Sequence, residues 1–175
     1  MIYSFKQITP DIHETVFTAD HTIITGDVKI EEYSSIWFST VIRGDVAPTR
    51  IGKRVNIQDL CCLHQSPNRP LIIEDDVTVG HQVTLHSSIL RKKSLIGMGS
   101  LILDGAEIGE EAFIGAGSLV PPGKRIPARH LAFGRPAKVI RPLNEKDIKD
   151  MERIRREYVA KGQEYKSAAR FPSSP

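Results

Sequence analysis

Three of the six histidines in this 175-residue chain fall close together, namely His64, His81 and His86. Each follows a large aliphatic residue by one or two positions. Neutral imidazole nitrogens are good ligands for zinc, and they also suit cobalt and ferrous iron. Further polar residues with a place in such a site lie nearby in the sequence: Arg43, Asp45, Gln58 and Asp59. Three histidines without a paired serine or thiol favour metal chemistry over covalent catalysis.

These histidines lie within a repeat that has a period of six residues. Aliphatic residues recur at every sixth position, apart from two insertions and a one-residue slip: Ile24, Ile30, Ile36, Ile42, Ile51, Ile57, Leu63, Ile73, Val79, Leu85, Leu90, Ile96, Ile102, Ile108, Ile114, Val120 and Ile126. A small or β-branched residue often lies four positions further on. The period fits neither a helix nor an alternating strand. It predicts a mainly β protein, a parallel β-helix in which three hexapeptides make one triangular coil. A β-sandwich would give no reason for a period of six.

Counting hexapeptides around the triangle places the histidines on two different faces. The residues that follow successive aliphatic positions form one outward column, which contains Arg43, His64 and His86. A second column, on the preceding face, contains Asp59 and His81. His64 and His86 are therefore expected to direct two imidazoles toward one point, as two ligands of a tetrahedral metal do. Because His81 points elsewhere, we predict that it completes the site of a neighbouring copy in a threefold homotrimer, with one metal per interface.

The rest of the chain is expected to form three parts: a β-helix domain at 10–143, a C-terminal helix at 144–166 and a disordered tail at 167–175. Loops are expected to protrude at the two insertions, around Ala47-Pro48-Thr49 and Ser66-Pro67-Asn68. Asn144 is the predicted N-cap of the helix. An apolar stripe on this helix is expected to pack along the β-helix or on a partner subunit: Ile148, Met151, Ile154, Tyr158 and Tyr165.

Composition and charge exclude several classes of function. A net charge of +3 and scattered cations argue against nucleic-acid binding. Without a signal peptide or an apolar run of about 18 residues, the chain is expected to be cytoplasmic and free of membranes. Cys61 should point inward and Cys62 should lie at a corner, neither of them as a nucleophile. His13, His21 and His130 are expected to be ordinary surface histidines.

Together these motifs resemble the γ-class carbonic anhydrase family and its bacterial relatives. The resemblance covers roughly residues 10–143 and rests on IRGDV (42–46), NIQD (56–59), LH (63–64), VGHQVTLH (79–86) and the GMGS and GAGSLV coils. It implies a left-handed β-helix and a homotrimer with zinc at the subunit interfaces. It also implies the reversible hydration of CO2 to bicarbonate.

The same resemblance assigns roles to individual residues. Zinc would be bound by His64 and His86 of one subunit and by His81 of its neighbour. Gln58 would hydrogen-bond the water or hydroxide on the metal. The interface and the surroundings of the ligands would be ordered by Arg43, Asp45 and Asp59.

Two positions depart from the pattern of the best-characterised members. Those proteins carry a glutamate directly after the RGD aspartate and another in an acidic loop near the first zinc histidine. Here the first position is Val46, and the loop at 65–70 contains no carboxylate. The group that would carry the proton out of the site is therefore not identified, and CO2 hydration that is weak or absent stays an open outcome.

Other classes of function also stay open. Hexapeptide β-helices include CoA-dependent acyltransferases, which use a histidine base without a three-histidine metal site. Some relatives of the γ-class anhydrases act on CoA thioesters, and such a thioesterase would keep the metal and use a groove near Gly134-Arg135-Pro136. A non-catalytic trimeric scaffold is the remaining alternative. One metal ion per subunit would separate the metal enzymes from the acyltransferase.

Overall fold

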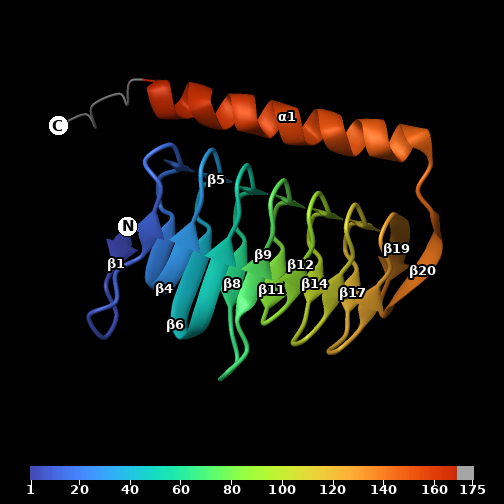
Figure 1. Cartoon of the computed structure of the whole chain (residues 1–175), viewed down its shortest axis with the longest axis horizontal. Helices are drawn as coiled ribbons and strands as arrows, with labels where there is room; N and C mark the ends of the chain where they lie inside the picture. Colours follow the sequence, from blue (N-terminus) through green and yellow to red (C-terminus); the bar gives the residue numbers. More distant parts are fainter. Residues whose placement is uncertain (169–175) are drawn as a thin grey trace.

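The computed structural model describes residues 1–168, which form a left-handed coil of short parallel strands with one long helix along its side (Figure 1). Of the tail predicted at 167–175, residues 169–175 lie outside the described residues, and Ser167 instead ends the C-terminal helix. Twelve strands form a sheet that covers two faces of the coil: β1 (Ile2–Tyr3), β2 (Asp11–Ile12), β4 (Ile23–Ile30), β6 (Val41–Ile51), β8 (Cys62–His64), β9 (Leu71–Ile73), β11 (Thr84–His86), β12 (Ile89–Leu90), β14 (Leu101–Ile102), β15 (Glu107–Ile108), β17 (Leu119–Val120) and β18 (Arg125–Ile126). Eight strands form the third face: β3 (Phe17–Thr18), β5 (Ser35–Ile36), β7 (Asn56–Ile57), β10 (Thr78–Val79), β13 (Leu95–Ile96), β16 (Phe113–Ile114), β19 (His130–Gly134) and β20 (Ala137–Pro142).

The register of the strands confirms the predicted coil. On the third face, four aliphatic residues lie side by side in successive coils and are fully buried: Ile36, Ile57, Val79 and Ile96. The residues expected to point inward four positions after an aliphatic residue are also buried: Val28, Ser34, Val55, Val77 and Val83. The period of six arises because each hexapeptide supplies one strand with an inward aliphatic side chain and one turn with an inward small side chain.

The turns between faces pass through residues in the left-handed backbone region. At the corner that follows β5, β7, β10, β13 and β16, these residues have φ between 58° and 70°: Ser39, Leu60, Gln82, Gly99 and Gly117. Glycine adopts this conformation readily, whereas other residues incur a cost of about 1–2 kcal/mol. The hydrogen bonds between stacked coils hold the non-glycine residues there. Leu60 N–H, for example, donates to Phe38 O of the preceding coil at 3.0 Å.

The two insertions adopt different structures. The loop expected around Ala47-Pro48-Thr49 does not form, and that prediction is wrong: these residues lie within β6, an 11-residue strand that continues around the corner. The inserted residues form an irregularity within this strand: the register with β4 shifts between Gly26 and Val28, and pairing with β4 and β9 resumes at Thr49. The second insertion forms the expected loop, at 65–70, which projects beyond the neighbouring coils (Figure 1).

The chain leaves the coil through an antiparallel pair, β19 and β20, and enters α1 (Glu145–Ser167). The Asn144 side chain accepts a hydrogen bond from Asp147 N–H at 2.9 Å, and the Asp147 carboxylate accepts one from Asn144 N–H at 2.8 Å. The predicted N-cap is therefore confirmed as a reciprocal capping box. Helix α1 then runs back toward the N-terminal coils (Figure 1).

The apolar stripe of α1 packs along the β-helix, which is one of the two arrangements expected. Met151 is buried, and the rings of Tyr158 and Tyr165 stand edge-on to Trp37 with centroids 5.4 and 5.3 Å apart. Such aromatic pairs contribute beyond the apolar area that they bury. Across residues 1–168, no helix has the length and apolar character needed to cross a bilayer.

Replacing Trp37 with alanine should lower the free energy of unfolding by about 3–5 kcal/mol, because the indole is buried between the β-helix and α1. Denaturant titration followed by circular dichroism measures this change. Phe133→Ala is the control, since Phe133 is 53% exposed and its loss should cost less than about 1 kcal/mol. Similar losses in both variants would contradict the role of Trp37 as the anchor of α1.

Candidate metal centre

The parallel pair β8–β11 brings two of the three predicted histidines together. His64 and His86 occupy matched positions in neighbouring coils. Leu63 and Leu85, directly before them, point into the core, so both imidazoles project outward from the same face. His64 Nδ1 lies 3.3 Å from His86 Nε2. The predicted pairing of these two side chains is confirmed.

The ring nitrogens that face away from this point are each held by a carboxylate. His64 Nε2 lies 3.1 Å from Asp45 Oδ1, and His86 Nδ1 lies 3.0 Å from Asp104 Oδ2. A carboxylate accepts a hydrogen bond from an imidazole N–H, so these contacts select the tautomers with protons on those outer nitrogens. Histidines that bind metals are commonly oriented in this way.

The chemistry of this pair fits a bound cation. In the tautomers that the carboxylates select, lone pairs of His64 Nδ1 and His86 Nε2 face one another. Two lone pairs at 3.3 Å repel unless a positive charge lies between them. Two nitrogens that share a tetrahedral zinc at the usual bond length are themselves separated by about 3.3 Å. The observed spacing is compatible with two ligands of one zinc ion.

His81 lies on the other face of the coil, as its column predicts. It follows β10, and its Nδ1 is 2.7 Å from Asp59 Oδ2 in the preceding coil. Its imidazole is 40% exposed. Within residues 1–168 of one chain, no three histidine, cysteine or acidic side chains come close enough to hold a metal together. One chain therefore presents a histidine pair and a separate single histidine, each held by an aspartate.

Arg43 and Gln58 take up different positions relative to the histidines. Arg43 Nη1 donates to Asp45 Oδ2 at 2.6 Å, so the carboxylate joins Arg43 to His64. Gln58 is nearly buried, and its Nε2 donates to Asn56 Oδ1 at 3.1 Å. Gln58 does not adjoin the His64–His86 pair. Together with His81 it lines a largely apolar groove of about 320 Å³ between the third face and α1. The other residues that line this groove include Leu95, Met98, Phe113, Ile154 and Tyr158.

Asp104 and Ser66 were not among the residues predicted for this site. Asp104 follows β14, whose Ile102 is in register with Leu85 of β11. The column that contains His64 and His86 continues with Leu103, so the count alone does not place the Asp104 carboxylate, one residue further on, beside His86. Ser66 belongs to the inserted loop and donates to Asp104 Oδ1 at 2.5 Å. Its position could not be read from the repeat, because the insertion interrupts the count.

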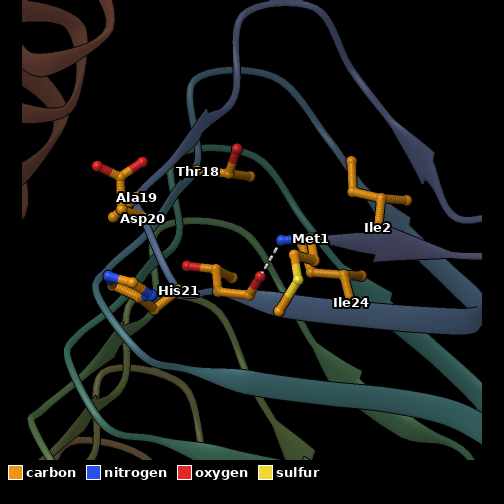
Figure 2. A pocket seen from close by; sticks show the side chains of 8 residues that line it. Met1, Ile2, Thr18, Ala19, Asp20, His21 and Ile24 are labelled. Carbon is orange, nitrogen blue, oxygen red and sulfur yellow. Dashed lines mark hydrogen bonds between the residues drawn. The ribbon is translucent and has the colours of Figure 1, made fainter. Parts of the chain in front are cut away.

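Two of the three remaining histidines, His13 and His130, have local hydrogen-bond partners. His13 Nδ1 lies 2.9 Å from Thr15 Oγ1, and His130 Nδ1 lies 2.8 Å from the backbone carbonyl oxygen of Ala128. His21 lines a separate pocket of about 370 Å³ at the N-terminal end of the coil. Figure 2 shows the terminal amine of Met1 on one side of this pocket and the His21 side chain on the other. None of these residues contacts the His64–His86 pair.

The two cysteines are unpaired thiols in different surroundings. Cys61 is buried as predicted, its Sγ is 3.1 Å from Gly80 O, and burial raises the pKa of its thiol to about 12. Cys62 is exposed, but it begins β8 rather than lying at a corner, which corrects that expectation. A thiol needs ionisation to act as a nucleophile, so Cys61 is unsuited to this role at neutral pH.

This difference between the cysteines leads to a simple thiol test. In a Cys62→Ser variant, the native protein should show no thiol that reacts with Ellman's reagent at pH 8 within minutes, because Cys61 is buried and protonated. One thiol per chain should react after denaturation. Rapid labelling of the native variant would show that the coil opens near Cys61 far more readily than its packing indicates.

Comparison with known proteins gives relatives along nearly the whole chain. The chain is 72% identical over 167 residues to a "Carbonic anhydrase" of Geobacillus kaustophilus, covering 95% of this chain and 92% of that protein. It is 76% identical over 166 residues to the "Uncharacterized transferase YtoA" of Bacillus subtilis, covering 95% and 97%. It is 34% identical to "Gamma carbonic anhydrase 2, mitochondrial" of Arabidopsis thaliana over 86% of this chain and 56% of that protein.

Solved structures lead to the same architecture. A hexapeptide transferase family protein from Anaplasma phagocytophilum has a TM-score of 0.91 and 35% identity, covering 94% of this chain and 97% of that one. No protein-family model matches the chain. The names of these relatives divide between anhydrase and transferase, so the chemistry must be argued from the site.

Proposed function

Since this chain belongs to the γ-carbonic-anhydrase-like family of hexapeptide-repeat proteins, we propose that it is a zinc-dependent enzyme that hydrates CO2 reversibly to bicarbonate. The observation that carries the proposal is the His64–His86 pair, with both outer ring nitrogens held by carboxylates and both inner nitrogens at a spacing suited to zinc. Cobalt and ferrous iron are alternative occupants of the same nitrogen ligands.

The third ligand in this proposal is His81 of a neighbouring subunit in a homotrimer. Asp59 holds Nδ1 of His81, which leaves Nε2 of this 40% exposed ring available to a ligand. A cyclic trimer would place the corner that carries His81 against the His64–His86 face of the next copy, and each of three equivalent interfaces would then hold one metal. Every ligand would have its own aspartate: Asp45 for His64, Asp59 for His81 and Asp104 for His86.

Zinc bound by three histidines supplies an activated water at neutral pH and thereby a nucleophile for CO2. The residues of the chain orient this reaction. Gln58, fixed by its bond to Asn56, would offer its amide to the reacting water or to bicarbonate. The Asp45 carboxylate, bound to Arg43, holds the His64 ring in place. The apolar groove beside His81 would admit uncharged CO2 more readily than ions.

Proton export is the step for which the chain offers no evident group. Val46 is 45% exposed where well-characterised members carry a glutamate, and the loop at 65–70 has no carboxylate. Asp104 lies beside that loop, but both of its oxygens are engaged, by Ser66 and His86. The proton would therefore pass directly to buffer, which limits turnover when buffer is scarce.

Metal analysis followed by stopped-flow CO2 hydration tests the proposal. We expect about one zinc per subunit and a hydration rate that rises several-fold when imidazole is added as an external proton carrier. A protein that binds no metal would refute the metal centre and favour the acyltransferase or the trimeric scaffold. A protein loaded with metal but inert toward CO2, with and without imidazole, would refute the anhydrase activity.

The groove between α1 and the third face favours one second candidate, hydrolysis of a CoA thioester. Its apolar lining by Leu95, Phe113 and Ile154 suits an acyl chain, and His81 also lines it. This candidate would be favoured if the zinc-loaded protein hydrolysed a short acyl-CoA and did not accelerate CO2 hydration. Loss of that turnover on zinc removal would separate it from an acyltransferase that needs no metal.

A further inference from the structure

We infer that Ser66 and Asp104 are positioning residues, which together fix the ring and tautomer of His86 for metal binding. The inference rests on the proposed function for the identity of the ligand. It concerns residues outside the pattern by which the metal centre was predicted, because Ser66 belongs to the insertion and Asp104 to a coil beyond the histidines. Neither residue would contact the metal or the substrate.

Asp104 uses a different oxygen for each neighbour. Its Oδ1 accepts from Ser66 Oγ at 2.5 Å, and its Oδ2 lies 3.0 Å from His86 Nδ1. An ionised carboxylate is an acceptor only, so it selects the His86 tautomer with a proton on Nδ1 and a free lone pair on Nε2.

The loop holds the Ser66 hydroxyl in a defined place. Ser66 N–H donates to Ser87 Oγ at 2.7 Å, and that hydroxyl donates in turn to Arg69 O at 2.9 Å. Arg69 N–H closes the turn by donating to Ser66 O at 3.2 Å. The protruding loop is thus tied to the coil beside His86, and its hydroxyl is oriented before any metal arrives.

The two histidines of the pair are supported in the same manner. Arg43, Asp45 and His64 form one chain of contacts, and Ser66, Asp104 and His86 form the other. In each chain the carboxylate joins an anchor through one oxygen and an imidazole through the other. The residues that hold the two carboxylates differ in charge. The Arg43 guanidinium neutralises the Asp45 carboxylate. The neutral Ser66 hydroxyl does not offset the negative charge of Asp104, which therefore interacts with His86 in full.

Two measurements on the full-length protein test this inference. The first is the zinc dissociation constant, from competition with a chromogenic chelator. Asp104→Asn should raise it about 10–100-fold, and Ser66→Ala should raise it by a smaller factor. Ser66→Thr keeps the hydroxyl and should restore the wild-type value. Asp150→Asn, on the exposed face of α1, is the matched control for loss of a carboxylate and should have no effect.

The second measurement needs no metal. Nitrogen-15 spectra of the zinc-free protein report which ring nitrogen of His86 carries the proton, with His86→Ala to assign the signals. We expect the Nδ1-protonated tautomer in the wild type and a mixture in Asp104→Asn, because an amide can also donate to Nδ1. A merely structural role for Asp104 would leave the tautomer unchanged.

The outcomes separate this inference from the proposed function. If Asp104→Asn and Ser66→Ala both kept the wild-type His86 tautomer and the wild-type zinc affinity, the inference would be overturned. A wild-type protein loaded with zinc would still support the metal centre in that case. A wild type that binds no zinc would overturn the metal centre. In that case, loss of the Nδ1-protonated form in Asp104→Asn would still support the positioning of His86.

Discussion

His81→Ala is expected to reduce the zinc content of the protein from about one ion per subunit to below about 0.1, with the fold intact. The imidazole is 40% exposed and contacts Asp59 rather than the core, so its removal leaves no cavity. Two remaining histidines from one subunit would hold zinc far less tightly than three. Elemental analysis after dialysis measures the metal, and circular dichroism with a melting curve measures the fold.

His21→Ala is the matched control, because it removes another exposed histidine at the same corner of an earlier coil. This variant should keep its zinc. If His81→Ala also kept a full complement of zinc, the proposed third ligand would be wrong. If it lost zinc together with the fold, His81 would have a structural role that its exposure does not suggest.

The repeat predicted most of the fold because a six-residue period has few structural solutions. Each aliphatic position, such as Ile57 or Leu85, points into the same interior, so sequence distance converts directly into a position on the coil. The same count placed His64 beside His86 and Asp59 beside His81 without any knowledge of the coordinates. Columns of outward residues are therefore as predictable as the core, provided that the count is unbroken.

Predictions failed where an insertion broke the count. Ala47 and Thr49 were expected in a loop, yet both lie within β6, where the extra residues are taken up at a shift in register and Thr49 pairs with Val28 and Leu71. The contact between Ser66 and Asp104 joins residues 38 positions apart, and one of them lies in an insertion. No periodicity fixes where an inserted hydroxyl points, so this contact required the structure.

If the metal site is shared between subunits, two variants that bind no zinc separately should bind it when they form mixed trimers. His81→Ala and His64→Ala should each bind no zinc alone, because every interface in either trimer lacks one ligand. When the two variants are unfolded together in equal amounts and refolded, about one quarter of the interfaces should regain zinc. Such an interface pairs the intact His64–His86 face of one variant with the intact His81 of the other.

The matched control is a mixture of His64→Ala and His86→Ala. Both lesions lie on the same face, so every interface still lacks a ligand from that face, whichever copies meet, and no zinc should return. Differently tagged copies show that hybrid trimers have formed in both mixtures.

Hybrid trimers without zinc in the first mixture would mean that the three histidines do not meet across an interface. Zinc in the control mixture would mean that His81 and one histidine of the pair suffice. Recovery in the first mixture alone requires that His81 act on the face of another copy, because in neither variant does one chain carry the complete set.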